Sequence, residues 1–165
     1  MSVTFHTTHG ELKIEVHCDK TPLSAKNFLA LCARGDYNNT IFHRCIRGFI
    51  IQGGDPTNTG KGGDSIYIDK YFKDEIMPDL KHDKRGVVSM ANSGPNTNAS
   101  QFFITFSKQN HLNGSYTVFG KVIDGWECLD LMEKEPVDGN DKPLNEIKIH
   151  KVTIHANPIA EIEQE

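Results

Sequence analysis

Two stretches near the N-terminus alternate apolar and polar residues with a period of two. They cover residues 3–7 and 11–17, and His9-Gly10 lies between them. Period-two alternation is typical of half-buried strands, and a short glycine-containing connection is typical of a hairpin. The pattern therefore predicts an antiparallel hairpin at the start of the chain.

The next segment has a helical period. Thr21 precedes Pro22, and Pro is favoured at the first helical position, so we expect Thr21 to be the N-cap. Gly35 follows as the expected C-cap glycine. The apolar positions between them, at i, i+3, i+4 and i+7, share one buried helix face: Ala25, Phe28, Leu29 and Cys32.

Short apolar runs separated by segments rich in Gly, Asn or Pro make up most of the remaining chain. Such spacing predicts a closed all-β barrel or a sandwich. A second helix is expected over residues 126–132. The apolar runs cover residues 41–42, 49–51, 87–90, 102–104 and 116–119.

The last strand changes its phase. Ile147 and Ile149 alternate on one phase and Val152 and Ile154 on the other, so a strand with one buried face needs a bulge near His150-Lys151. A short acidic segment follows. We therefore divide the chain into one domain, residues 1–157, and a tail, residues 158–165.

Composition narrows the function classes. The 165 residues suit one domain, and 18 Lys plus Arg against 22 Asp plus Glu give a net charge of −4, which disfavours direct nucleic-acid binding. The N-terminus does not read as a signal peptide, and no apolar run is long enough for a membrane span. The four cysteines form no CxxC pair and are read as reduced thiols. We expect an intracellular protein of the nucleus, the cytoplasm or both.

Several familiar motifs are incomplete in this chain. Gly60-Lys61 resembles the end of a P-loop, but the required earlier glycine is Asp55 and the residue after the lysine is Gly62. The eight histidines lack metal-site spacing, and no GxSxG nucleophile elbow is present. We expect neither a metal nor a cofactor.

Two segments carry polar residues that a simple packing pattern does not explain. Arg44 and Gln52 interrupt apolar runs within residues 42–55, and residues 89–105 are rich in Asn and Ser. The arginine could extend along the surface to water, and the second segment could be an ordinary loop. Alternatively, an arginine, an amide and phenylalanines meet in one apolar pocket with a few placed donors.

These segments resemble the cyclophilin family of peptidyl-prolyl cis-trans isomerases from about Val3 to Ile154. The matching runs are FHR, GFIIQGGDPTNTGKGG, VVSMANSGPNTNASQFFIT and YTVFGKVIDG. His111-Leu112, Tyr116-Thr117 and the ending VTIHANP are most similar to the single-domain cyclophilin-like protein 3 subgroup, whose relatives are linked to nuclear splicing. The resemblance implies a closed eight-stranded antiparallel β-barrel capped by two helices, with the substrate in an outer groove.

The resemblance also implies roles for individual residues. Arg44 would be the catalytic arginine, acting without a nucleophile, metal or cofactor. The proline ring would bind among Phe49, Ile50, Phe103 and Leu112. The peptide backbone would be held by Gln52, Asn92 and Gln101, with His43, Ala91, His111 and Tyr116 on the rim. A neighbouring pocket for the side chain before the proline would be bordered by Ser93, Thr97, Asn98, Ala99 and Ser100.

The chain departs from the family pattern at a few positions. Many cyclophilins have a tryptophan at His111 and a histidine at Tyr116, so cyclosporin binding is expected to be weakened. Ile50 replaces a common methionine at similar volume. Ala99 replaces a glycine, which would shift the second pocket if that position requires a positive φ.

Three functions remain open on the sequence. The leading one is an isomerase acting on X-Pro bonds of exposed protein segments. The second is a module that binds proline-containing segments of splicing-complex proteins, with incidental catalysis. The third is a chaperone for unfolded chains, which a mean hydropathy of −0.47 disfavours. A monomer is expected in each case.

Overall fold

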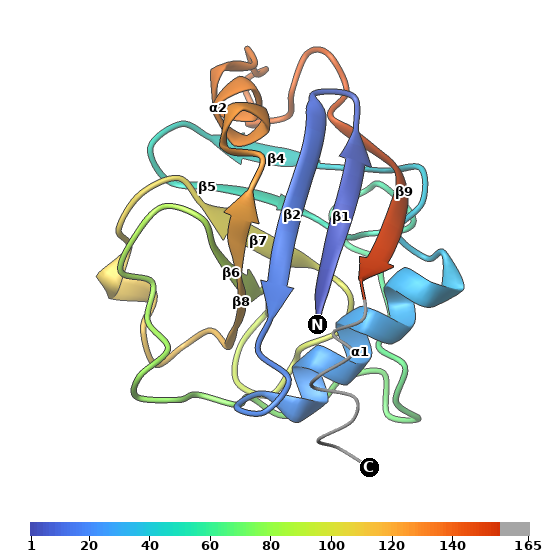
Figure 1. Cartoon of the computed structure of the whole chain (residues 1–165), viewed down its shortest axis with the longest axis vertical. Coiled ribbons are helices and arrows are strands. Elements are labelled where there is room, and N and C mark those ends of the chain that lie inside the picture. The colour runs from blue at the N-terminus through green and yellow to red at the C-terminus, as the bar shows by residue number, and fades with distance from the viewer. Residues whose placement is uncertain (156–165) are drawn as a thin grey trace.

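The fold is a single curled antiparallel sheet with two α-helices. The computed structural model describes residues 1–155, so the predicted tail over residues 158–165 lies outside the described residues. The strands follow the order β3-β9-β1-β2-β8-β6-β7-β5-β4. In Figure 1, β1, β2 and β9 run in front of β4 and β5, which cross them at a steep angle. The strand bounds are β1 Ser2–Thr7, β2 Gly10–Val16, β3 Thr40–Ile41, β4 Arg44–Ile46, β5 Ile50–Gly53, β6 Val87–Met90, β7 Phe102–Thr105, β8 Val118–Asp124 and β9 Lys148–His155.

The mainly β fold is confirmed, but among the described residues the sheet has nine strands instead of the eight expected, and it is a curled half-barrel whose end strands, β3 and β4, do not pair with each other to close it. The difference arises where the chain bends at Phe42-His43 and divides residues 40–46 into two short strands. The first, β3, pairs with β9, and the second, β4, pairs with β5. Because β3 and β4 are the two ends of the sheet, these two residues connect its opposite edges.

The hairpin and the bulge predicted from the sequence are both confirmed. β1 and β2 pair in register from Ser2 to Thr7. Against β9, His6 pairs with Lys151 and Thr7 with Ile149, so His150 is the extra residue. The bulge lets residues on both sides of His150 keep their apolar side chains toward the core.

Helix α1 (Pro22–Arg34) closes one end of the curled sheet. It ends where predicted, with Gly35 in the left-handed conformation at a φ of 80°. Its buried Phe28 lies against the rings of Phe5, Phe102 and Phe119, with centroids 5.0 to 6.0 Å apart. The predicted apolar face is therefore the face that fills the main core.

The N-terminus of α1 differs in one respect from the prediction. Thr21 occupies the N-cap position, but its hydroxyl donates to the His17 carbonyl instead of capping the helix. The Glu75 carboxylate accepts the backbone N–H groups of Leu23 and Ser24 at 3.0 and 2.7 Å. The negative charge of this carboxylate also interacts favourably with the positive end of the helix dipole. The cap thus comes from a distant segment.

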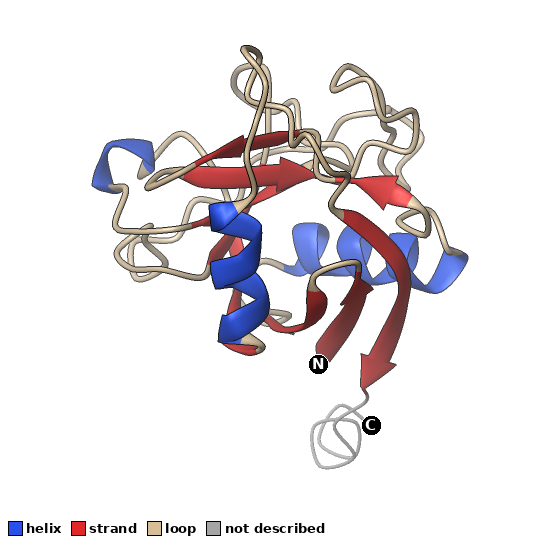
Figure 2. Cartoon of the chain, turned by 90° about the horizontal axis from the view of Figure 1, so that it is seen from above, coloured by secondary structure: helices blue, strands red, loops and turns tan. Residues whose placement is uncertain are grey.

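Helix α2 (Trp126–Lys134) extends two residues beyond its predicted end and packs against β2 and β4. Figure 1 shows α1 and α2 at opposite ends of the molecule. A 3₁₀ turn, η1, covers Asn110–Leu112. Figure 2 shows long loops gathered on the side of the sheet away from the N-terminus. None of the helices within residues 1–155 is long and apolar enough to cross a membrane.

Candidate active site

One row of side chains crosses four strands on the outer face of the sheet. Arg44 on β4 pairs with Gln52 on β5, Gln52 pairs with Phe103 on β7, and Phe103 pairs with Ser89 on β6. Directly paired residues point to the same face, whereas strand neighbours such as Ile51 point into the main core. Strand alternation therefore explains why an arginine and a glutamine stand in apolar runs.

A pocket of about 250 Å³ lies along this row, and we call it the apolar pocket. Ile50, Phe103 and Leu112 form a small buried cluster separate from the main core. Phe49, Ala91 and Tyr116 pack against that cluster. Of these six side chains only Tyr116 carries a polar group, and such a surface suits a small apolar ring. The apolar pocket is lined by Arg44, Phe49, Ile50, Gln52, Ala91, Asn92, Phe103, Leu112 and Tyr116.

A chain of hydrogen bonds holds the guanidinium of Arg44. Its Nη1 donates to Gln52 Oε1 at 3.4 Å, and Gln52 Nε2 donates to Gln101 Oε1 at 3.0 Å. Gln101 Nε2 in turn donates to the carbonyls of Gly60 and Gly62, each at 3.0 Å. The two amides are thus engaged with each other. A guanidinium has five N–H donors, so Arg44 keeps others for a ligand.

His82 supports the apolar pocket from behind. Its ring is stacked on Phe103, with centroids 5.8 Å apart and an interplanar angle of 15°. It contacts Asn113 Oδ1 at 2.8 Å and Ser89 Oγ at 3.0 Å. Burial lowers the pKa of His82, which favours the neutral ring at physiological pH. The histidine therefore fixes Phe103 and the loop that carries Leu112.

A second pocket, of about 290 Å³, adjoins the first, and we call it the polar pocket. The two pockets share Gln52, Ala91 and Asn92. The Asn92 side chain links two loops, because its Oδ1 accepts the Gly94 N–H of its own loop and its Nδ2 donates to the Ser115 carbonyl in the β7–β8 connection. The polar pocket is lined by Gln52, Gly60, Lys61, Gly62, Gly63, Lys70, Tyr71, Ala91, Asn92, Ser93, Thr97, Ala99 and Gln101.

Asp55 orders the loop on one side of the polar pocket. Its carboxylate accepts the backbone N–H groups of Thr57, Thr59, Gly60 and Gly62 and the hydroxyls of both threonines. Burial alone would raise the pKa of Asp55, but these hydrogen bonds lower it to about 2. The loop that resembled a P-loop therefore directs its backbone N–H groups to its own Asp55 carboxylate.

Most of the residues expected from the sequence do meet around the two pockets. Four do not line either pocket: His43, Asn98, Ser100 and His111. Those that do are Arg44, Phe49, Ile50, Gln52, Ala91, Asn92, Ser93, Thr97, Ala99, Gln101, Phe103, Leu112 and Tyr116.

The structure gives a physical reason for each exception. The His43 ring lies under the Gly60 backbone, and burial lowers its pKa. Asn98 is fully buried and its Nδ2 donates to the Phe72 carbonyl and to Asp74. Ser100 is also buried, and its Oγ donates to the Gly54 carbonyl at 2.7 Å. His111 stacks on Phe49, with centroids 5.8 Å apart, and so supports the apolar pocket from outside.

Ala99 keeps an ordinary backbone conformation, so the loss of a glycine there causes no strain. Positive φ outside glycine is confined, within residues 1–155, to Asn39, Asn58, Asn96 and Asp141.

Sequence reasoning missed one side of the polar pocket. Lys61 lies in a loop that was interpreted only as an incomplete P-loop, although it belongs to a run that matches the cyclophilin pattern. Lys70 and Tyr71 carry no local signal at all, because they reach the pocket through the tertiary fold.

The curled antiparallel sheet and the two adjoining pockets on its outer face define a barrel-like β protein with an arginine beside an apolar pocket. The chain belongs to the cyclophilin-type peptidyl-prolyl cis-trans isomerase family, whose sequence profile matches residues 2–154. It is therefore an isomerase of X-Pro peptide bonds, as the sequence indicated.

Close relatives support this assignment over the full length. The chain is 66% identical to peptidyl-prolyl cis-trans isomerase-like 3 of Dictyostelium discoideum, covering 97% of this chain and 99% of the relative. It is 61% identical to the Homo sapiens protein of that name, covering 98% and 100%. A crystal structure of a cyclophilin-type isomerase of Cryptosporidium parvum, determined in the presence of the dipeptide Ala-Pro, superposes with a TM-score of 0.92 at 56% identity, covering 95% and 100%.

Proposed function

We propose that Arg44 is the catalytic group and that the apolar pocket binds the proline ring of the substrate. The observation that carries this proposal is the position of Arg44, at the edge of the apolar pocket and hydrogen-bonded to Gln52. A charged donor beside an apolar pocket can contact the amide nitrogen of a proline whose ring is bound there.

The chemistry requires no nucleophile. Rotation about a peptide bond has a barrier of about 18–20 kcal/mol, because the nitrogen lone pair is delocalised into the carbonyl. A guanidinium that hydrogen-bonds the nitrogen as it becomes pyramidal localises the lone pair and weakens the partial double bond. A charge-assisted hydrogen bond formed only in the twisted state contributes roughly 1.5–3 kcal/mol, or one to two decades in rate. A water-poor pocket that fixes the proline contributes further.

The amides of the site have a different role in this proposal from the one expected. Gln52 and Gln101 hold Arg44 and the 60–62 loop, and the Asn92 side chain joins its own loop to Ser115 in the β7–β8 connection. We assign Gln52 and Gln101 to positioning Arg44, and leave the backbone groups of Asn92 to bind the peptide main chain.

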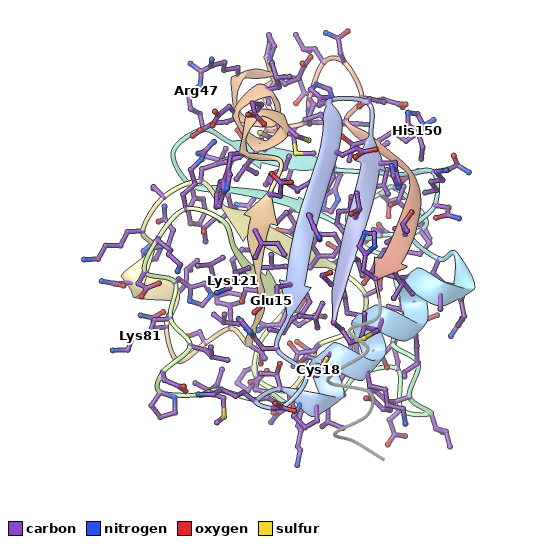
Figure 3. All side chains as sticks on the ribbon, viewed as in Figure 1. Glu15, Cys18, Arg47, Lys81, Lys121 and His150 are labelled. Carbon is purple, nitrogen blue, oxygen red and sulfur yellow. The ribbon has the colours of Figure 1, made fainter. Side chains whose placement is uncertain are left out.

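The test is isomerisation of an Ala-Pro peptide followed by NMR exchange. Uncatalysed exchange takes tens of seconds or more, so weak catalysis is measurable. Arg44→Ala should lower kcat/KM about 10- to 100-fold with an unchanged unfolding transition. Arg47→Ala is the matched control, because Arg47 is exposed and lines neither pocket (Figure 3). Wild-type turnover in Arg44→Ala would refute the proposed mechanism.

We also propose that the substrates include proline-containing segments of splicing-complex proteins, met in the nucleus by a monomeric enzyme. Two observations support this proposal: the sequence resembles the cyclophilin-like protein 3 subgroup, and relatives of that name match it over their full length. Cell fractionation and co-precipitation of splicing proteins with the full chain would test this. Recovery only in the cytosol, without these proteins, would argue against it.

A further inference from the structure

The residues that line the polar pocket have a net positive charge. Its lining includes two lysines, Lys61 and Lys70, and the phenol of Tyr71. Within the described part of the chain, no Asp or Glu belongs to this lining. The other lining groups are uncharged amides, hydroxyls, glycines and alanines. An anionic side chain that enters the pocket would therefore find cations on its rim and no carboxylate in the wall.

Lys61 is presented by a loop of fixed conformation. Its backbone N–H donates to Thr59 Oγ1 at 3.2 Å, and its neighbours Gly60 and Gly62 donate to Asp55. The Asp55 carboxylate is fully buried and already surrounded by N–H and O–H donors. Its charge is therefore largely compensated inside the loop, whereas the Lys61 side chain is left on the exposed rim.

Lys70 is held only weakly by its own partners. Its ammonium lies 3.7 Å from Asp64, and the two side chains are 49% and 77% exposed. It also lies 5.4 Å from the centre of the Tyr71 ring. Exposed ion pairs of this kind are weak, so a substrate carboxylate can replace Asp64 at little cost.

The shared wall of the two pockets determines which substrate residue reaches these lysines. Gln52, Ala91 and Asn92 line both pockets, so one extended peptide can occupy both. Side chains alternate along an extended chain, and residues two apart point to the same side. A peptide whose proline is in the apolar pocket thus directs the residue two positions earlier toward the polar pocket, one position further from the proline than the resemblance implied.

We propose that this isomerase selects substrates with Glu or Asp two positions before the proline, through Lys61 and Lys70. The proposal rests on the function proposed above, because it requires proline in the apolar pocket. Both lysines are exposed, so the preference is modest: we expect kcat/KM about three- to fivefold higher for Glu than for Gln at low salt. The preference should decline as ionic strength rises.

The experiment compares peptides Xaa-Ala-Pro-Phe in which Xaa is Glu, Gln or Lys, using NMR exchange at two salt concentrations. The Glu:Gln ratio of kcat/KM is measured within each protein, so a general loss of activity cancels. The ratio should approach one in the double variant Lys61→Gln/Lys70→Gln. It should stay at the wild-type value in Lys81→Gln, because Lys81 projects from the same β5–β6 connection outside both pockets (Figure 3).

The outcomes separate this proposal from the proposed function. A Glu:Gln ratio of one or less in the wild type, with all peptides isomerised, overturns the charge selection alone. An unchanged ratio in the double variant does the same, because the preference would then arise elsewhere. If no peptide is isomerised, the proposed function fails and the selection falls with it.

Discussion

Gln52 occupies the point where the two pockets meet, and its amide joins Arg44 to Gln101. If it positions Arg44, Gln52→Leu should lower kcat about three- to tenfold with a smaller change in KM. This modest decrease in kcat is expected because the variant loses one hydrogen bond to a charged group, and that bond is long and exposed to solvent. Gln52→Glu keeps an acceptor for the guanidinium and should recover part of kcat. Steady-state kinetics on an Ala-Pro peptide measure both values.

The same variants distinguish positioning from direct binding. A rise in KM at constant kcat in Gln52→Leu would mean that the amide binds the substrate backbone equally in the ground and transition states, as the family resemblance implies.

His111 determines how far the apolar surface extends beyond Phe49. The two rings stack at an interplanar angle of 25°, and the His111 side chain is exposed. An indole at this position would enlarge the apolar surface beside the pocket. We therefore expect weak cyclosporin inhibition of the wild type and inhibition at least about tenfold tighter in His111→Trp, which corresponds to about 1.4 kcal/mol. Equal inhibition constants in a titration would show that this position does not limit drug binding.

At the scale of the elements, the loop over residues 55–63 is organised around one charged group, the Asp55 carboxylate. The pKa of Asp55 falls from 3.8 to about 2, which corresponds to about 2 kcal/mol of stability. A lowered carboxyl pKa stabilises the fold above the unfolded value, and that contribution is lost as pH falls from about 4 to about 2. Asp55→Asn should therefore lower the free energy of unfolding by about 2 kcal/mol at pH 7, measured by urea denaturation.

The matched control for this element is Asp64→Asn. Asp64 lies just beyond the loop with its side chain 77% exposed, and its contact with Lys70 is a weak surface pair. The Asp64→Asn substitution should change the free energy of unfolding by less than about 0.5 kcal/mol. Equal losses in the two variants would mean that the buried hydrogen bonds of Asp55 are not what orders the loop.

Helix α1 shows how far an element can be predicted from its own residues. Its length, its buried face and Gly35 followed from local signals within residues 21–35. Its capping group did not, because Glu75 lies about 50 residues away and reaches the helix only through the fold. A capping carboxylate can come from any loop that passes the helix end, and no spacing rule identifies that loop.

At the scale of the whole molecule, one fully buried histidine, His82, and two partly buried ones, His17 and His43, make stability depend on pH. Burial lowers the pKa of His17, His43 and His82 below 6.5, and for His17 the nearby Lys121 adds to the effect while Glu15 opposes it. Glu15 and Lys121 face each other across β2 and β8 (Figure 3). The unfolded chain therefore takes up protons first as pH falls.

The lowered pKa values determine the direction in which stability changes with pH. Stability from these groups is fully present above about pH 6.5 and is lost as pH falls below that value. Urea denaturation should thus show a lower free energy of unfolding at pH 5.5 than at pH 7.5, and His82→Gln should reduce the slope. His150→Gln, on the exposed bulge of β9, is the control. A flat or opposite slope in the wild type would contradict the burial effect.

The site itself divides in the same way between local and long-range information. Arg44, Phe49, Gln52 and the Gln101–Phe103 run could be assigned from the sequence, because they lie in continuous motifs. The exclusion of His43, Asn98, Ser100 and His111 from the pockets could not, since it depends on which way each side chain faces after the strands pair.

The sequence by itself determined the hairpin, α1, the bulge at His150 and the family, since each depends on periodicity or on residues close together in the chain. Only the tertiary structure decided the ninth strand and the Glu75 cap. It also brought Lys70 and Tyr71 to the polar pocket. These features join segments far apart in the chain, and their contacts exist only after strand register and loop paths are established, so no local pattern encodes them.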